Sequence, residues 1–309
     1  MKKRVLIIKL GYCETLINEQ GFVPSLGDVF RHTVLLHHYA NDEVTWLTSK
    51  SAEPLLKDNP FINKLVIYNE NTASEMAGTT FDEVLCLEKS HTLSQIADSV
   101  NAVRRLGFRT SSTATLAHHG SHTALNIANG QDHFLSIQSV LFQMVGDYWN
   151  GENYILGYKP KQLEPFDVGL NFRVGTKWPS KQWPEENWKE LERLLIGHDL
   201  KVNWQKGETD LYEYMDWINA GRMTITCDSL GMHLAIAMNK KVVALFGPTP
   251  ADDIYMYGKG VILSAEWACS EAPCLKSECD QDQSCMRELN PKMVARAVIN
   301  ILNGRNGKK

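Results

Sequence analysis

The feature that most constrains the fold is a repeated alternation of short apolar runs with helical stretches. In the first half, apolar runs such as Arg4–Leu10 and Phe81–Leu87 alternate with stretches of helical pattern such as Leu93–Leu106. The apolar runs are continuous, which is typical of strands buried on both faces. The pattern therefore predicts parallel sheets covered by helices.

The alternation stops at Gly151–Pro165, a stretch with Gly, Pro and Lys, and restarts with a strand over Asp167–Phe172. A chain of 309 residues also has the length of about two domains. We therefore predict an α/β chain with two Rossmann-like, doubly wound domains that face a central cleft. The expected division is residues 1–163, residues 164–290 and a final segment, 291–309. The site is expected at the cleft, outside the carboxyl ends of the strands.

Charge and hydropathy exclude several classes of protein. The net charge is −4, whereas nucleic-acid binding usually shows as a basic domain, so no nucleic-acid partner is expected. No apolar run approaches the ~18 residues that a transmembrane helix needs. The opening MKKRVLIIKLG resembles a signal peptide, but Lys9 interrupts its apolar core, and a buried first strand fits better. The expected location is cytoplasmic, with reduced thiols.

The most informative motif is DSLGMH, residues 228–233, which follows a predicted strand and opens a helix. Asp228 or Ser229 can cap that helix, and Gly231 lets a ligand approach the backbone. Free N–H groups and the helix dipole then form an anion site suited to a diphosphate, to which His233 can donate. An ordinary strand–helix junction is the alternative.

A second candidate anion site is the loop GTKWPSKQWPEENW, residues 175–188, which follows the first strand of the second half. Thr176, Lys177 and Lys181 can neutralise a diphosphate leaving group there. The alternative is a solvated lysine loop pinned by two buried tryptophans, because exposed lysine is the norm.

Two further charged features lie in the first half. Asp28 stands in the first turn of a predicted helix, where the helix N-terminus favours its ionised form, and an ionised carboxylate can serve as a general base. It can instead simply complement the helix dipole. Arg104, Arg105 and Arg109 form a basic patch around the end of the predicted helix Leu93–Leu106, where they complement the helix C-terminus or grip a phosphorylated acceptor.

Four of the seven cysteines fall in one stretch with the spacing C-x4-C-x4-C-x5-C. Reduced cysteines this close together can bind zinc or iron, although the spacing is not that of a C-x2-C knuckle. Free thiols that pack a loop, or a disulfide, are the alternatives. The candidate ligands of a structural metal are Cys269, Cys274, Cys279 and Cys285.

Six segments in order make the chain similar to glycosyltransferase family 9, the ADP-heptose lipopolysaccharide heptosyltransferases. They are VLIIKLG, SLGDV, FDEVLCLE, KQWPEENW, CDSLGMHLAIAMNKKVVALFGPT and CSEAPCLKSECDQDQSCM. The resemblance implies a GT-B fold and an inverting transfer of a sugar from a nucleotide diphosphate, with ADP-heptose favoured and no cofactor required for catalysis. It implies a glycan or glycolipid acceptor, as in lipopolysaccharide biosynthesis, with possible peripheral contact to the inner membrane. It also implies that the helix Pro291–Leu302 crosses back to the first domain, and that a cysteine finger can hold iron.

The resemblance assigns roles to individual residues. Asp28 corresponds to the base that deprotonates the acceptor hydroxyl, and the first domain is the acceptor side. Glu208 corresponds loosely to an acidic residue that binds the nucleoside of the donor. The residues that hold the donor would be Thr176, Lys177, Lys181, Glu208, Asp228, Ser229, Gly231, Met232 and His233.

The chain departs from the family pattern at two places. Residues 12–24 are inserted between the first strand and Ser25, which makes them either an acceptor-reading loop or a tolerated surface insertion. Leu230 disturbs the donor motif, so the donor sugar is left open. Two alternative functions also stay open: a non-catalytic nucleotide-sugar-binding or assembly subunit, and a GT-B enzyme that acts on the donor alone.

Overall fold

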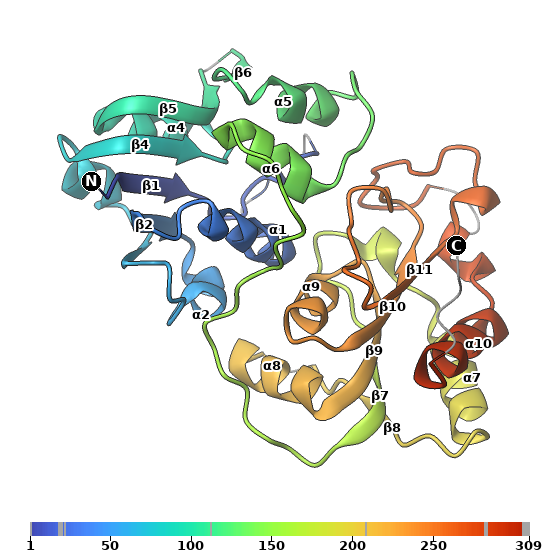
Figure 1. Ribbon diagram of the computed structural model, residues 1–309. Coiled ribbons are helices and arrows are strands. Elements are labelled where there is room, and N and C mark those ends of the chain that lie inside the picture. The colour runs from blue at the N-terminus through green and yellow to red at the C-terminus, as the bar shows by residue number, and fades with distance from the viewer. Residues whose placement is uncertain are drawn as a thin grey trace. The chain divides into compact units, whose positions relative to one another are not determined.

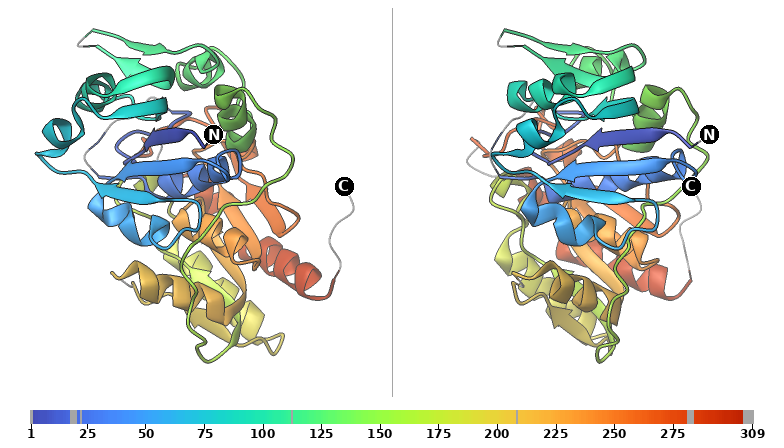
Figure 2. Two further views of the ribbon diagram at one scale, coloured as in Figure 1. Left: turned by 60° about the vertical axis from the view of Figure 1, so that its left-hand side comes forward. Right: turned by 90° about the vertical axis from the view of Figure 1, so that its left-hand side faces the viewer.

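The computed structural model describes residues 2–17, 21, 23–111, 113–207, 209–280 and 284–304. The chain forms two compact units, Met1–Tyr158 and Lys159–Lys309. Their boundary falls inside the predicted linker Gly151–Pro165, which contains no helix or strand. Figure 1 shows each unit built around its own sheet, and Figure 2 shows the two sheets from further directions.

The sheet of the first unit has the strand order β3-β2-β1-β4-β5-β6. Its strands β1 to β5 are parallel, and β6 is antiparallel to β5. The strands are β1 (Arg4–Ile8), β2 (Glu43–Thr48), β3 (Lys64–Ile67), β4 (Thr80–Cys86), β5 (Asn101–Thr110) and β6 (Thr115–Ala117). The helices are α1 (Leu26–Arg31), η1 (His32–His37), η2 (Lys50–Ala52), α2 (Glu53–Leu56), α3 (Thr72–Met76), α4 (His91–Ser99), α5 (His122–Ala128) and α6 (Ile137–Val145).

The centre of this sheet is buried on both faces. All of Val5 to Ile8 in β1 are inaccessible to solvent, as the continuous apolar run predicts. One face packs on α3 and α4 through residues such as Leu6, Met76 and Leu93. Because β1 and β4 are neighbours, the residues that follow them come together at one edge of the sheet.

One predicted element of the first unit is wrong. The stretch Leu93–Leu106 is not one helix, because α4 ends at Ser99 and the chain continues as strand β5, which pairs with β4. Two arginines on this strand have hydrogen-bond partners nearby. Arg104 donates to the Glu83 carboxylate on β4 at 3.0 Å, and Arg105 donates to the Val100 carbonyl at 2.7 Å. The basic patch therefore lies on a strand, from which Arg105 still reaches the last carbonyls of α4.

The sheet of the second unit is parallel throughout, in the order β11-β10-β9-β7-β8. The strands are β7 (Phe166–Asn171), β8 (Val202–Trp204), β9 (Gly221–Cys227), β10 (Lys241–Phe246) and β11 (Gly260–Ser264). The helices are η3 (Pro179–Lys181), α7 (Glu185–Ile196), α8 (Leu211–Ala220), α9 (Leu230–Ala237), η4 (Glu266–Ala268), η5 (Cys285–Glu288) and α10 (Pro291–Leu302). The two sheets confirm the predicted α/β class with two Rossmann-like units.

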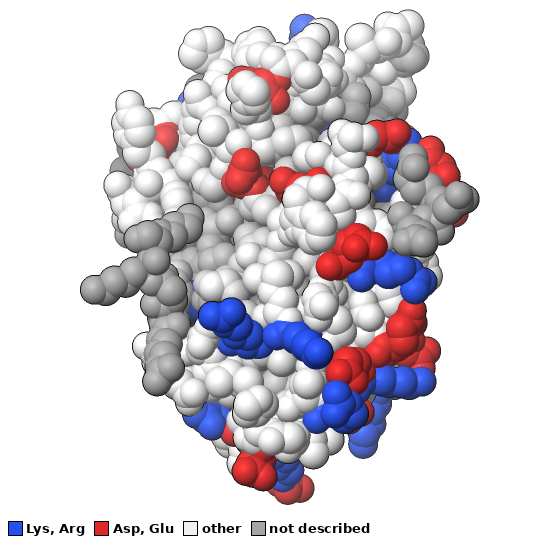
Figure 3. Space-filling model, turned by 90° about the vertical axis from the view of Figure 1, so that its right-hand side faces the viewer, with Lys and Arg blue, Asp and Glu red and all other residues white. Residues whose placement is uncertain are grey.

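The final helix α10 is part of the second unit. It packs against α7, β10 and β11, and its apolar face, including Val294 and Val298, completes a core that contains Trp183 and Trp188. The predicted crossing of this helix to the first unit stays a prediction. None of the helices within the described ranges is long and apolar enough to cross a membrane. On the face drawn in Figure 3, acidic and basic side chains are interspersed.

Candidate functional site

In the first unit, Asp28 lies in the short helix α1 and is almost completely buried, at 3% exposure. Its carboxylate forms two ion pairs, with Lys9 Nζ at 2.5 Å and with Arg31 Nη2 at 2.9 Å. Burial disfavours the charged form, but the two cations outweigh this effect and hold the pKa of Asp28 well below its usual range. Asp28 is thus ionised, as predicted, chiefly because of side-chain cations that the sequence analysis did not single out.

In the second unit, the loop after β7 and the loop after β9 meet in an ion pair. Lys181 Nζ lies 2.6 Å from Asp228 Oδ2, with 10% and 16% of the two side chains exposed. Thr249 donates a hydrogen bond to the same carboxylate oxygen at 2.9 Å. Burial alone would raise the pKa of Asp228. The charge of Lys181, and to a smaller extent that of His233, lowers the pKa by more than this, so the net shift is downward. The structure therefore joins two of the predicted donor-binding residues directly.

The start of α9 is held by a buried polar network. Asn171 at the end of β7 donates to Ser229 Oγ at 3.2 Å and accepts from the Tyr214 hydroxyl at 3.0 Å. Gly231 lies against this network, because a Cβ there would come within 2.2 Å of the Tyr214 oxygen and 2.6 Å of Asn171 Nδ2. The glycine of the motif is therefore required by packing on these side chains, and Asn171 and Tyr214 are supporting residues that the sequence analysis missed.

The other predicted donor residues differ in their surroundings. Thr176 is exposed, and Met232 and His233 are buried in α9. The Nζ atom of Lys177 is buried and has no hydrogen-bond partner among the described residues. A buried ammonium group without a partner is costly, and an anionic ligand would satisfy it. Glu208 lies outside the described residues.

The four clustered cysteines line one small cavity of about 20 Å³ together with Ser180 and Lys276. Burial and the other three cysteines raise the pKa of the Cys285 thiol. Within the described ranges, no group of three or more Cys, His, Asp or Glu side chains is positioned to hold a metal ion. Ser180 also donates to the carbonyl of Lys276 at 2.6 Å, which ties the cysteine-rich loop to the residue next to Lys181.

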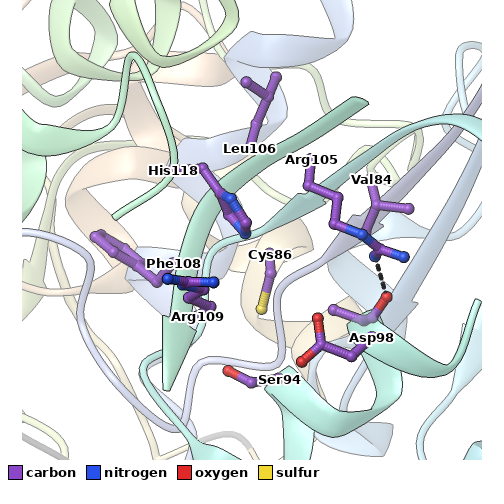
Figure 4. A pocket seen from close by; sticks show the side chains of 10 residues that line it. Val84, Cys86, Ser94, Asp98, Arg105, Leu106, Phe108, Arg109 and His118 are labelled. Atoms are coloured by element: carbon purple, nitrogen blue, oxygen red, sulfur yellow. Dashed lines mark hydrogen bonds between the residues drawn. The ribbon is translucent and has the colours of Figure 1, made fainter. Parts of the chain in front are cut away.

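A narrow surface gap in the first unit is surrounded by Arg105, Arg109 and His118, with Cys86 between them (Figure 4). Arg105 donates to the carbonyls of Ala97 and Val100, so it closes the end of α4. Burial, together with the charges of Arg109 and Arg105, lowers the pKa of His118. Arg105 thus links β5 to the end of α4.

Comparison with known proteins relates both the sequence and the fold to one family. The model for "Glycosyltransferase family 9 (heptosyltransferase)" matches residues 205–284, which include the donor motif and the first three clustered cysteines. Lipopolysaccharide heptosyltransferase 1 of Pseudomonas aeruginosa is 28% identical in an alignment of 194 residues, with a coverage of 50% of this chain and 52% of the relative. The matched part of the chain thus spans about half the length of this curated relative.

Two solved structures share the fold over almost the whole chain. A family 9 glycosyltransferase from Veillonella parvula has a TM-score of 0.64 at 17% identity, covering 98% of this chain and 97% of that one. The iron-containing heptosyltransferase TibC of Escherichia coli, in complex with ADP-D-β-D-heptose, has a TM-score of 0.60 at 10% identity, covering 99% and 77%. The predicted GT-B fold class is confirmed, and so is the resemblance of this chain to glycosyltransferase family 9.

Proposed function

We propose that the protein is an inverting glycosyltransferase that transfers a heptose from ADP-heptose to a hydroxyl group of a surface glycan, as in lipopolysaccharide biosynthesis. The observation that carries this proposal is the family match over residues 205–284. The matched range contains Asp228, whose carboxylate pairs with Lys181 from the loop after β7. The buried Nζ of Lys177, which has no hydrogen-bond partner in the part of the chain that the structure describes, adds a second cation on the same loop as Lys181. Such fixed cations stabilise the charge that grows on a leaving diphosphate.

In this proposal the second unit binds the donor through Thr176, Lys177, Lys181 and residues 228–233, and Glu208 is the candidate for the nucleoside. Asp28 accepts the proton of the acceptor hydroxyl while that oxygen attacks the anomeric carbon and the diphosphate leaves. An ionised carboxylate is the correct form for this role. The reaction takes place on the cytoplasmic side, with a glycan or glycolipid acceptor that brings the enzyme to the inner membrane.

We further propose that the four clustered cysteines hold a structural zinc or iron ion. Thiolates suit either metal, and the four side chains line one cavity. A metal held by these thiolates would fix the loop to which Ser180 is hydrogen-bonded. The metal has no part in the transfer step.

The test is a transfer assay with ADP-heptose and lipopolysaccharide from a strain that lacks its heptosyltransferase. Wild-type protein should release ADP and add one heptose, whereas Asp28→Asn should lose at least ~100-fold in kcat, the lower range for general base catalysis, with unchanged binding of ADP. If ADP binds and no sugar moves to any glycan, the protein is a nucleotide-sugar-binding subunit. If ADP-heptose is converted without an acceptor, it acts on the donor alone.

A further inference from the structure

The start of the insertion, residues 13–17, is buried inside the first unit. Cys13, Thr15 and Leu16 are at most 1% exposed, and Glu14 and Ile17 are each 7% exposed. The insertion leaves and rejoins the fold at one point, because Ser25 N–H donates to the Gly11 carbonyl at 2.8 Å. The interpretation as a tolerated surface insertion is therefore wrong for this part, since such insertions lie on the surface.

Charged residues at the ends of two neighbouring strands hold this segment. Glu88, which follows β4, accepts hydrogen bonds from the backbone N–H of Gly11 at 2.6 Å and of Cys13 at 3.1 Å. Lys89 donates to the carbonyl of Ile17 at 2.8 Å, and Lys9, which follows β1, donates to the carbonyl of Cys13 at 2.8 Å. Buried charges are costly unless they are paired, and here three charged side chains from the strand ends are satisfied by the backbone of this segment and hold it in one position.

The hydroxyl of Thr15 connects the segment to the proposed base. His32 Nδ1 contacts the backbone carbonyl of Asp28, which can only accept a hydrogen bond, so Nδ1 carries the proton. Burial lowers the pKa of His32 to about 3, so its ring is neutral and Nε2 is an acceptor. Thr15 Oγ1 lies 2.8 Å from this Nε2 and must donate to it.

With its proton directed to His32 at 2.8 Å and not to Asp28 Oδ2 at 3.5 Å, the Thr15 oxygen is an acceptor for Lys9. Lys9 Nζ donates to it at 3.2 Å while also lying 2.5 Å from Asp28 Oδ2. The backbone N–H of Thr15 donates to the same Asp28 oxygen at 3.2 Å. Thr15 thus fixes Lys9, His32 and the carboxylate of Asp28 with respect to one another.

We propose that residues 13–17 of the insertion belong to the catalytic machinery and that Thr15 is a positioning residue for Asp28, acting through Lys9 and His32. This inference rests on the proposed function. In the transfer, the acceptor proton moves to Asp28, the acceptor oxygen bonds to the anomeric carbon, and the diphosphate leaves with the electrons of the broken C–O bond. Asp28 becomes neutral, and Glu88, 3.7 Å from Lys9 Nζ, remains as the counter-charge of that lysine.

The test compares Thr15→Val, which keeps shape and backbone N–H, with Thr15→Ser, which keeps the hydroxyl. In the transfer assay we expect Thr15→Val to lower kcat about tenfold or more, because small misplacement of a reacting group is costly. Binding of ADP should not change, and Thr15→Ser should restore most of the rate. When Thr15→Val is added to Asp28→Asn, kcat should fall by less than about twofold further, since the two changes act on one step.

The outcomes separate this inference from the proposed function. If folded Thr15→Val keeps full kcat while Asp28→Asn is inactive, the role of Thr15 is overturned and the proposed function stands. The same conclusion follows if Thr15→Val lowers kcat by the same factor in the wild type and in Asp28→Asn. Full kcat in Asp28→Asn overturns the base assignment itself. If Thr15→Val does not fold, ¹⁵N-histidine NMR of the wild type decides: we expect neutral His32 with the proton on Nδ1 at pH 5, and a proton on Nε2 overturns the inference.

Discussion

Replacing Lys181 with methionine removes the cation from the Lys181–Asp228 pair while keeping most of the side-chain volume. At 2.6 Å and an effective dielectric constant of ~20, the gross attraction is about 6 kcal/mol. Most of this is offset by desolvation, and breaking a fully buried pair costs about 3–5 kcal/mol. Thr249 still donates to Asp228, and 16% of that side chain meets water. We therefore expect a loss of about 2–3 kcal/mol, near the lower limit for a buried pair.

Two measurements test the effect of Lys181→Met. Differential scanning calorimetry should show a fall in Tm of roughly 5–10 °C, at ~2–4 °C per kcal/mol for a protein of this size. Titration calorimetry should show ADP binding about tenfold weaker, because a charge-assisted hydrogen bond contributes about 1.5–3 kcal/mol and Lys181 must first leave Asp228. The matched control is Lys189→Met on α7, whose partner Glu185 is equally exposed, and it should change neither value.

The pair also makes a pH prediction with a definite sign. Because the pKa of Asp228 is lowered in the folded protein, its contribution to the free energy of unfolding is present above its ordinary pKa of about 3.8 and is lost as the pH falls below that value. Lys181→Met should remove this contribution. An ADP affinity within twofold of wild type in Lys181→Met would refute the assignment of this loop to the donor.

Three other outcomes are expected. Gly231→Ala should lower stability by about 1–3 kcal/mol through overpacking on Tyr214, whereas Gly175→Ala, which meets open space, should not, as urea unfolding can show. The neutral state of buried His32 should make the free energy of unfolding fall as the pH drops from 6.5 to about 3, with a shallower slope in His32→Gln; an unchanged slope contradicts its burial as a neutral ring. Elemental analysis of protein purified under reducing conditions should find about one zinc or iron per chain and less in Cys274→Ser; metal-free wild type that retains its Tm contradicts the metal proposal.

The sequence predicts the strands that carry a run of buried apolar residues, and it misses a strand interrupted by charge and a short strand at a sheet edge. β1 and β4 were identifiable because their buried residues are contiguous. The first part of β5 falls within the predicted helix Leu93–Leu106, because Arg104 and Arg105 break its apolar pattern and only the neighbouring strand supplies Glu83 as a partner. β11 was not predicted, and its residues are only half-buried at the edge of the sheet.

The candidate site shows the same limit. The residues of the donor motif form one recognisable string, and the pairing of Lys181 with Asp228 follows once two loops meet at the ends of parallel strands. Lys9, which pairs with Asp28, and Glu88, which pairs with Lys9, were missed because they stand at the ends of two strands far apart in the sequence. A signal was present, since a lone charge that directly follows a fully apolar strand has to be paired when it is buried.

The most direct test of the account is titration calorimetry of the purified, reduced wild-type protein with ADP, UDP, GDP and dTDP under identical conditions. The account predicts that ADP binds most tightly and that Lys181→Met selectively weakens this binding. A preference for another nucleotide would contradict the heptose donor while leaving the fold and the base in place. No binding of any of the four at millimolar concentration would contradict the central claim that residues 175–181 and 228–233 form a donor site.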